Sequence, residues 1–364
     1  MPFYEEGEAR VYYNDSAFLN PKAKLIRDMS VAFMRAAVPK SSSVLDCTAA
    51  TGIRGIRYAL EAGMKDVTLL DINRKASLLA KKNAVLNKTK CKVMNKSIQE
   101  FANTCGARFG VIDLDPFGGV TPYVHDIMKI ISDNGYVMLT ATDGAVLCGA
   151  HPKACVKAYD AVPLHDELGH ETGIRLLAGY AARVAAQFNL GIEVVMAISH
   201  IHYMRLFMRV SHGSDRATSS VNELGYAYHC GKCFYHHSEK ALLPTMTLCP
   251  NCGSKLSIGG KIWLGKLYGR DIMAEMEKEM RDMGLAGAEL KPLQTMLGEL
   301  DSPLFYMIPK ITKHLGTKSV SPNAVIEHLR KQGYMATKTA FDPSGVKTDA
   351  PLVEVEQTVR RLSA

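Results

Sequence analysis

Short apolar runs alternate with segments of helical periodicity over the first part of the chain. The runs cover residues 43–45, 67–70, 92–94, 109–113 and 135–140. Runs of this length are typical of buried strands, and the short connections to the intervening helices favour parallel strands. The pattern therefore predicts an α/β domain with a doubly wound parallel sheet.

Two further apolar runs define the end of this sheet. A helix predicted over residues 173–188 precedes the runs 192–199 and 204–211, which are separated by His200-Ile201-His202-Tyr203. A connection of about four residues joins antiparallel strands, because parallel strands need a longer crossover. Five parallel strands followed by a hairpin indicate a Rossmann-like, seven-stranded class I S-adenosylmethionine-dependent methyltransferase rather than an NAD-binding domain. We interpret His200 and His202 as solvent-facing or RNA-facing, because nothing nearby completes a metal site.

Acidic and small residues follow the predicted strands at the edge where such sheets bind ligands. Asp46 ends the first strand and leads into the loop Cys47-Thr-Ala-Ala-Thr-Gly-Ile-Arg-Gly55, whose small side chains let backbone amides approach a ligand. Asp71 ends the second strand, where a carboxylate can bind ribose hydroxyls. The loop lacks a GxGxxG fingerprint, so these residues predict a nucleoside cofactor without identifying it.

The fourth strand ends in Asp113-Leu-Asp-Pro-Phe-Gly118. An acid followed by proline and an aromatic residue resembles the Asp-Pro-Pro-Tyr type of loop with which S-adenosylmethionine-dependent enzymes hold the amino group of a nucleobase. A simple strand end with a Pro-Gly turn is the alternative.

Near the N-terminus, a helix is predicted over residues 21–37 with Asn20 as its N-cap. Phe18, just before that cap, fits a hydrophobic staple.

Composition and charge indicate in which cell compartment the protein works and what kind of partner suits it. The 364 residues are 47% hydrophobic and 22% charged, as in ordinary globular proteins. We find neither a secretory signal nor an apolar run long enough to span a bilayer, so we expect a cytoplasmic protein without membrane contact. The formal charge of +8 suits a polyanionic partner without requiring one.

Four of the nine cysteines form two CxxC pairs, Cys230/Cys233 and Cys249/Cys252. Their spacing is that of a zinc ribbon with four thiolate ligands, and such a closed site predicts a structural Zn²⁺. His229, His236 and His237 lie beside the pairs and could substitute for a cysteine.

The C-terminal third changes in character. Residues 268–300 read as helical, and Ser321 opens a helix to about residue 332 that is followed by a β-wing. We interpret this end as winged-helix-like, with a solvated helical face as the alternative to a phosphate-binding face. Its basic residues are Lys310, Lys313, Lys318, Arg330, Lys331, Lys338 and Lys347.

Several long motifs together resemble the archaeal type of the tRNA guanine-26 N2-dimethyltransferase family, over nearly the whole chain. They are Phe18-Leu-Asn-Pro-Lys with Arg27-Asp28, Ala50-Thr-Gly-Ile-Arg-Gly-Ile-Arg57, Asp113-Leu-Asp-Pro-Phe-Gly118, Thr140-Ala-Thr-Asp-Gly-Ala145 with Cys148-Gly-Ala-His-Pro152, and Gly333-Tyr-Met-Ala-Thr337 with Pro343-Ser-Gly-Val-Lys-Thr348. The resemblance implies that S-adenosylmethionine contacts Arg27, Thr51, Arg54, Asp71, Ser97 and Ile98. We add Asp46 to this cofactor set. The resemblance also implies that the target guanine lies near Phe18, Asp115, Pro116 and Phe117.

We expect an enzyme that transfers one or two methyl groups from S-adenosylmethionine to the exocyclic N2 of a guanine in tRNA, which the resemblance places at position 26. We expect a methyltransferase domain at residues 1–225 and a family-specific, tRNA-binding domain at residues 226–364, in a protein that functions as a monomer. Asp115 and the Pro116 carbonyl would accept the two N2 hydrogens of guanine, with Phe117 and Phe18 stacking on the base. The alternatives are an adenine-N6 or cytosine-N4 methyltransferase and a non-catalytic, zinc-containing RNA-binding protein.

Overall fold

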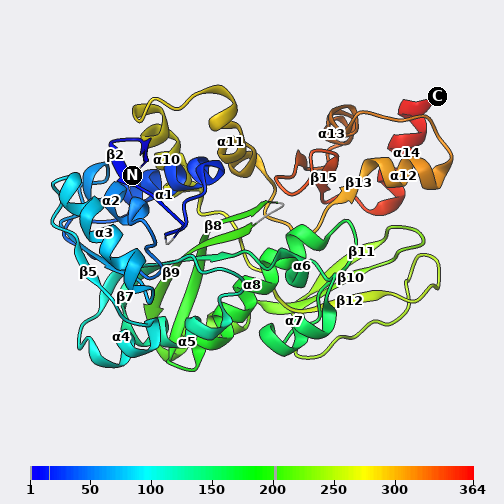
Figure 1. The fold of residues 1–364 in the computed structure, drawn as a ribbon. Helices are drawn as coiled ribbons and strands as arrows, with labels where there is room; N and C mark the ends of the chain where they lie inside the picture. Colours follow the sequence, from blue (N-terminus) through cyan, green and yellow to red (C-terminus); the bar gives the residue numbers. More distant parts are fainter. Residues whose placement is uncertain (1, 16, 201–202) are drawn as a thin grey trace.

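The computed structural model describes residues 2–15, 17–200 and 203–364, and its largest element is a seven-stranded sheet (Figure 1). The strand order is β5-β4-β3-β6-β7-β9-β8, in which the first five strands are parallel and β9 is antiparallel to both β7 and β8. The predicted sheet and hairpin are thus confirmed. Its strands are β3 (Ser43–Asp46), β4 (Asp66–Leu70), β5 (Lys92–Met94), β6 (Phe109–Leu114), β7 (Ile131–Ala141), β8 (Leu190–His200) and β9 (Tyr203–His212).

Helices cover both faces of this sheet because its strands are apolar on both sides. On one face the Phe33 ring of α1 contacts Phe207 of β9, with ring centroids 5.1 Å apart. On the other face α8 approaches so closely that a Cβ on Gly173 would lie 2.6 Å from the terminal carbon of Met204. The helices of this part are α1 (Lys24–Ala37) after the 3-10 turn η1 (Pro21–Ala23), α2 (Ile53–Leu60), α3 (Arg74–Leu86), α4 (Ile98–Thr104), α5 (Thr121–Ile130), α6 (Gly144–Leu147), α7 (Pro152–Tyr159), α8 (Gly169–Ala186) and α9 (Ser214–Val221).

An N-terminal hairpin escaped the sequence analysis. Strands β1 (Phe3–Glu6) and β2 (Ala9–Tyr12) pair antiparallel. Glu6 is buried there against Arg27 and Arg57, so a charged residue occupies an inward position where an apolar residue is usual. The prediction of an Asn20 cap is confirmed, since its side chain accepts a hydrogen bond from the Lys22 amide at 3.0 Å.

A second, three-stranded sheet has the order β11-β10-β12 and carries the two CxxC segments. The helices that follow it return to the main sheet, where Glu279 of α10 pairs with Arg35 of α1 at 3.5 Å. The division at residue 225 stays a prediction. These elements are β10 (Leu224–His229), β11 (His236–Glu239), β12 (Ser257–Trp263), α10 (Arg270–Asp282), the 3-10 turn η2 (Gly287–Glu289) and α11 (Lys291–Gly298).

The C-terminal end is a small helical unit with a three-stranded sheet, at the upper right of Figure 1. One expectation about it is wrong. Lys347 does not face phosphates, because it is buried between Glu171 and Glu299, each 2.9 Å from its ammonium nitrogen. The unit comprises β13 (Tyr306–Met307), α12 (Ile308–Leu315), α13 (Pro322–Lys331), β14 (Ala336–Lys338), β15 (Gly345–Thr348) and α14 (Leu352–Ser363). Within the described residues, no helix combines the length and the hydropathy that crossing a membrane requires.

Candidate active site and cysteine cluster

The loop Asp115–Gly118 leaves the carboxyl end of β6, and threonines of two neighbouring loops hold it at both ends. The Asp115 amide donates to Thr48 Oγ1 at 3.1 Å, and the Gly118 amide donates to Thr142 Oγ1 at 2.7 Å. The Thr142 amide in turn donates to the Gly118 carbonyl at 2.9 Å. These contacts fix the backbone from which the Asp115 carboxylate and the Pro116 carbonyl project. The sequence analysis selected neither threonine, although both lie within stretches that it quoted.

Two aromatic rings stand exposed beside this loop. The Phe117 side chain is 76% exposed and that of Phe18 is 57% exposed. Their ring centroids lie 5.0 Å apart with an interplanar angle of 75°. Neighbouring exposed rings form an apolar patch, and such patches are typical of ligand-binding or partner-binding surfaces. A ring this exposed is also not a buried staple, so the staple interpretation of Phe18 is wrong.

A cluster of buried charges lies beneath the loop. Arg205 makes two parallel hydrogen bonds to Asp113, at 3.0 and 2.9 Å, and Tyr58 donates to the same carboxylate at 2.5 Å. Arg54 pairs with the Asp115 carboxylate and lies 3.7 Å from Asp113. Burial by itself would raise the pKa of Asp113, but the guanidinium groups of Arg205 and Arg54 outweigh it and lower the pKa. Asp113 is therefore held as a carboxylate.

Asp46 lies at the end of the adjacent strand and behaves differently. Burial and the negative charge of Asp113 raise its pKa to about 7. The Gly55 amide donates to Asp46 Oδ2 at 3.2 Å, and a Cβ on Gly55 would collide with Leu69, so this approach needs glycine. The hydrogen bond thus joins the start of α2 to the end of β3, while the role of the small-residue loop in binding a ligand stays a prediction.

The other predicted cofactor residues line the same edge of the sheet. Asp71 accepts the amides of Ala50 and Asn73, both at 2.8 Å, which ties the acid to the small-residue loop. Ser97 caps α4 by accepting the Glu100 amide at 3.1 Å, and Ile98 beside it is buried. Two buried polar atoms, Thr51 Oγ1 and Arg54 Nη1, have no hydrogen-bond partner among the described residues. Arg54 Nη1 keeps only the ion-pair contact of 3.7 Å with Asp113. Buried polar atoms without a hydrogen bond are costly, so both atoms are candidate contacts for a polar ligand.

Arg27 has protein partners in this structure. Its guanidinium donates twice to Glu6, at 2.7 and 2.5 Å, and once to the Asn20 carbonyl at 3.1 Å. Its predicted contact with the cofactor stays a prediction.

Tyr203 is a residue near the site that the sequence analysis did not select. Its hydroxyl interacts electrostatically with the charges of Arg205, Arg54, Asp115 and Arg27, and its pKa is raised chiefly by burial. Its ring stacks on His200 at 5.0 Å; His202 lies outside the described residues.

The four cysteines of the CxxC pairs converge as predicted. The sulfur pairs Cys230/Cys252 and Cys233/Cys249 are each 3.5 Å apart, and all four sulfurs lie within 4.8 Å of one another. A tetrahedral zinc with Zn–S bonds of about 2.3 Å places its ligands about 3.8 Å apart. The donor set and spacing therefore fit Zn²⁺.

Purified protein should contain about one zinc ion per chain, because four thiolates close a tetrahedral site. A variant with Cys233→Ser and Cys249→Ser should lose that zinc, as measured by elemental analysis. Cys105→Ser is the matched control, since Cys105 lies outside the cluster and its thiol contacts the Ala107 carbonyl. Full zinc content in the double variant would contradict the assignment.

His229 does not substitute for a cysteine, as the sequence had left open. Its Nδ1 lies 2.8 Å from Asp166, and its Nε2 lies 3.3 Å from Glu167, which also pairs with Lys310 at 2.9 Å. Burial would lower the pKa of His229, but the two carboxylates raise it to about 9. These residues line a cavity of about 400 Å³ between the loop that precedes α8, the sheet of β10, β11 and β12, and Lys310 of the C-terminal unit.

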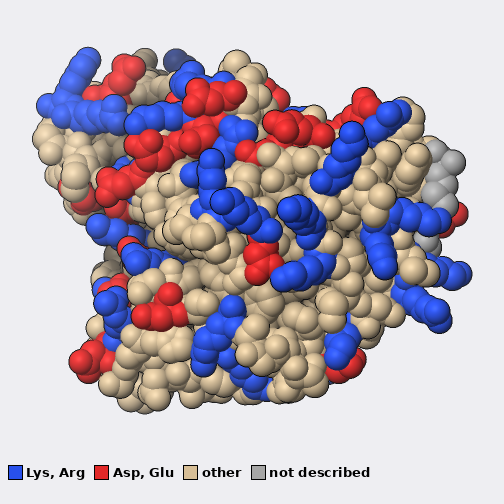
Figure 2. Space-filling view, turned by 90° about the vertical axis from the view of Figure 1, so that its left-hand side faces the viewer, with Lys and Arg blue, Asp and Glu red and all other residues tan. Residues whose placement is uncertain are grey.

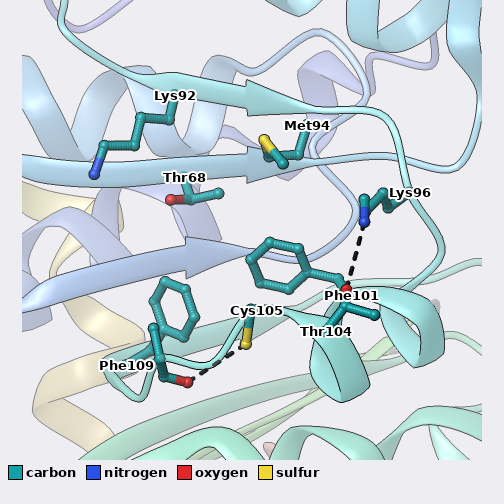
Figure 3. Close-up of a pocket in the computed structure, with 9 residues that line it drawn as sticks. Thr68, Lys92, Met94, Lys96, Phe101, Thr104, Cys105 and Phe109 are labelled. Atoms are coloured by element: carbon teal, nitrogen blue, oxygen red, sulfur yellow. Dashed lines mark hydrogen bonds between the residues drawn. The ribbon is translucent and has the colours of Figure 1, made fainter.

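Another cavity, of about 340 Å³, lies between the edge strand β5, α4 and the start of β6 (Figure 3). Phe101, Phe109 and Met94 form its apolar wall, while Lys92 and Lys96 come from its β5 side. The Lys96 ammonium donates to Thr104 at 3.4 Å. None of the predicted site residues lines it.

The chain is similar to known proteins over nearly its full length. Residues 3–360 match the model of the family described as N2,N2-dimethylguanosine tRNA methyltransferase. Two similar proteins are named tRNA (guanine(26)-N(2))-dimethyltransferase. The one from Pyrococcus horikoshii is 38% identical, and the alignment covers 98% of each chain. The one from Methanothermobacter thermautotrophicus is 33% identical, and the alignment covers 95% of this chain and 93% of the relative. The solved complex of Trm1 from Pyrococcus horikoshii with S-adenosyl-L-methionine has a TM-score of 0.90 at 36% identity and covers 98% of this chain and 99% of its own.

Proposed function

The chain belongs to the N2,N2-dimethylguanosine tRNA methyltransferase family, and from this premise we propose that it methylates the exocyclic N2 of a guanine in tRNA, once or twice, at position 26. It is an S-adenosylmethionine-dependent enzyme. The observation that carries the assignment to this site is the loop Asp115–Gly118, which presents a carboxylate and an exposed ring at the carboxyl edge of the sheet. That edge is where open α/β sheets bind their ligands.

The residues beside this loop fit the cofactor. S-adenosylmethionine supplies a methyl group on a positively charged sulfur, which is open to attack by a lone pair. We propose that Asp71 binds its ribose. We also propose that Thr51 Oγ1 and Arg54 Nη1, which have no hydrogen-bond partner among the described residues, bind its polar groups. The remaining members of the proposed cofactor set are Arg27, Asp46, Ser97 and Ile98.

Asp115 and Pro116 are proposed to activate the amino group. Guanine N2 is a weak nucleophile because its lone pair is delocalised into the ring. A carboxylate and a carbonyl that accept its two hydrogens reduce that delocalisation and aim the lone pair. The hydrogen bonds from the Asp115 and Gly118 amides to Thr48 and Thr142 support this role, since they hold both acceptors in place. Asp115 then takes the proton that N2 loses, and the hydrogen that remains permits a second transfer.

Phe18 and Phe117 are proposed to stack on the target base. An enzyme that modifies a base must take it out of the helical stack, and aromatic faces replace the lost stacking. The two rings now contact each other edge to face, so the guanine either stacks on an open ring face or separates them.

We further infer that residues 226–364 form the tRNA-binding domain, with the four cysteines around a structural zinc, and that residues 1–225 carry the chemistry. Four thiolates would leave a bound zinc ion no open coordination position, so the four cysteines would hold it to stabilise the fold. The enzyme is proposed to act as a monomer in the cytoplasm.

The test of this function is incubation of the protein with radiolabelled S-adenosylmethionine and an unmodified tRNA transcript, followed by nucleoside analysis. Label should appear in N2-methylguanosine and N2,N2-dimethylguanosine. Label in methyladenosine or methylcytidine would contradict the assignment and favour a different amino-methyltransferase.

A further inference from the structure

The net positive charge of this protein arises from one short segment. Residues 74–96 contain eight of the 44 lysines and arginines and none of the 36 acidic residues, so the rest of the chain holds 36 of each and is formally neutral. The segment comprises α3 and the edge strand β5, far in sequence from the C-terminal basic residues. Figure 2 faces this side of the molecule, where Lys and Arg predominate across the middle and acidic side chains gather toward the top.

Most of these side chains are exposed and unpaired. Lys92 and Lys96 pair with Asp66 and Glu100, at 2.8 and 3.1 Å. The other six have no carboxylate within the 4.0 Å limit of an ion pair in the part of the chain that the structure describes, and each is exposed. The six are Arg74, Lys75, Lys81, Lys82, Lys88 and Lys90.

Helix stability does not explain this arrangement. Arg74 and Lys75 occupy the first turn of α3, which has no acidic residue, and the last turn has no basic residue. Cations are unfavourable at a helix N-terminus, so the charges oppose the helix dipole. Lysine on an edge strand can prevent aggregation, but that role applies to Lys92 of β5 and not to the outer face of α3.

The surface also lies beside the proposed active site. Helix α3 begins directly after the Asp71 loop, and β4 is separated from β6 by a single strand, which places the ends of β4 and β6 about 10 Å apart. The thirteen residues of α3 extend the basic face about 20 Å away from that edge.

We propose that the outer face of α3, continued by Lys88 and Lys90, binds phosphates of the tRNA whose guanine is methylated. The inference rests on the proposed function, which supplies the polyanion. A face that carries the net charge of the protein, unpaired and beside the target loop, is complementary to an RNA backbone. Leu78 and Val85 are 55% and 72% exposed within the same face, and their aliphatic surfaces lie where sugar groups of a bound RNA would lie.

The variant Lys81→Gln with Lys82→Gln tests this surface. Its Kd for a fluorescently labelled, unmodified tRNA transcript should rise about tenfold, and the slope of log affinity against log salt should fall in magnitude by about 1.5, because two phosphate contacts are lost. The measurement is fluorescence anisotropy without cofactor, between about 50 and 200 mM salt. S-adenosylmethionine titration of the variant checks that it is folded.

The matched control is Lys153→Gln with Lys157→Gln, which removes the same charge from two exposed positions of α7. The control should bind tRNA as the wild type does. An unchanged Kd and salt slope in the α3 variant, or an equal loss in the control, would overturn the proposal. Because binding is read without methyl transfer, these outcomes are distinct from a failure of the proposed function, in which the wild type would transfer no methyl group to guanine.

Discussion

Replacing Asp115 by alanine is expected to lower kcat for methyl transfer by about a thousandfold. In the proposed mechanism the variant lacks a hydrogen-bond acceptor for guanine N2 and the base that takes its proton, and each such contribution is typically worth about 10²- to 10³-fold or more. The affinity for tRNA should change less, because the proposed stacking on Phe18 and Phe117 does not involve Asp115. Single-turnover transfer to a tRNA transcript measures kcat, and anisotropy measures tRNA affinity.

Two controls separate this role from a structural one. Asp282→Ala removes the same type of side chain at the exposed end of α10 and should leave kcat unchanged. Asp115→Asn keeps a hydrogen-bond acceptor but not the base, so its kcat should lie between those of alanine and the wild type. Near-normal turnover in folded Asp115→Ala protein would contradict the proposed role.

Replacing Arg205 by methionine is expected to lower the free energy of unfolding by about 3 to 5 kcal/mol. Both Arg205 and Asp113 are fully buried, and Arg205 makes two hydrogen bonds to that carboxylate and one to Thr140 at 2.6 Å. Removing one partner of a buried pair leaves the other charge unsatisfied, which is the source of the large cost. Urea denaturation followed by fluorescence measures the change.

Arg209→Met is the control on the same strand. Arg209 is exposed and donates one hydrogen bond to Asn134 at 3.1 Å, so its loss should change the free energy of unfolding by less than about 0.5 kcal/mol. Equal effects of the two substitutions would show that the Arg205–Asp113 pair does not hold the sheet together.

The sequence was sufficient for features set by local pattern. Apolar periodicity predicted the strands, and the parallel arrangement then placed Asp46, Asp71 and Asp115 at one edge, where the structure has them. The spacing of the CxxC pairs was enough to bring four sulfurs together. The family resemblance, rather than periodicity, selected Phe18, whose ring does meet Phe117.

Features that depend on distant charge pairs were not predictable in this way. The first strand was not predicted because the charged residue Glu6 occupies one of its inward positions. The partners that make its burial possible, Arg27 and Arg57, lie in helices further along the chain. Lys347 read as a surface lysine, since its partner Glu171 lies 176 residues away in sequence. Arg205 could not be told apart by pattern, because Arg209 lies in the same apolar run and is exposed, and the sequence did not identify Asp113 as the partner of Arg205.

The most direct measurement of the central claim uses a tRNA transcript with inosine in place of the target guanosine. Inosine lacks the 2-amino group and otherwise keeps the guanine ring, so it removes the atom that the Asp115-Pro116 loop is proposed to hold. The account predicts that labelled methyl transfer to this transcript is abolished while its affinity for the enzyme is nearly unchanged. Transfer at a rate comparable to that of the guanosine transcript would contradict the claim that N2 is the methyl acceptor.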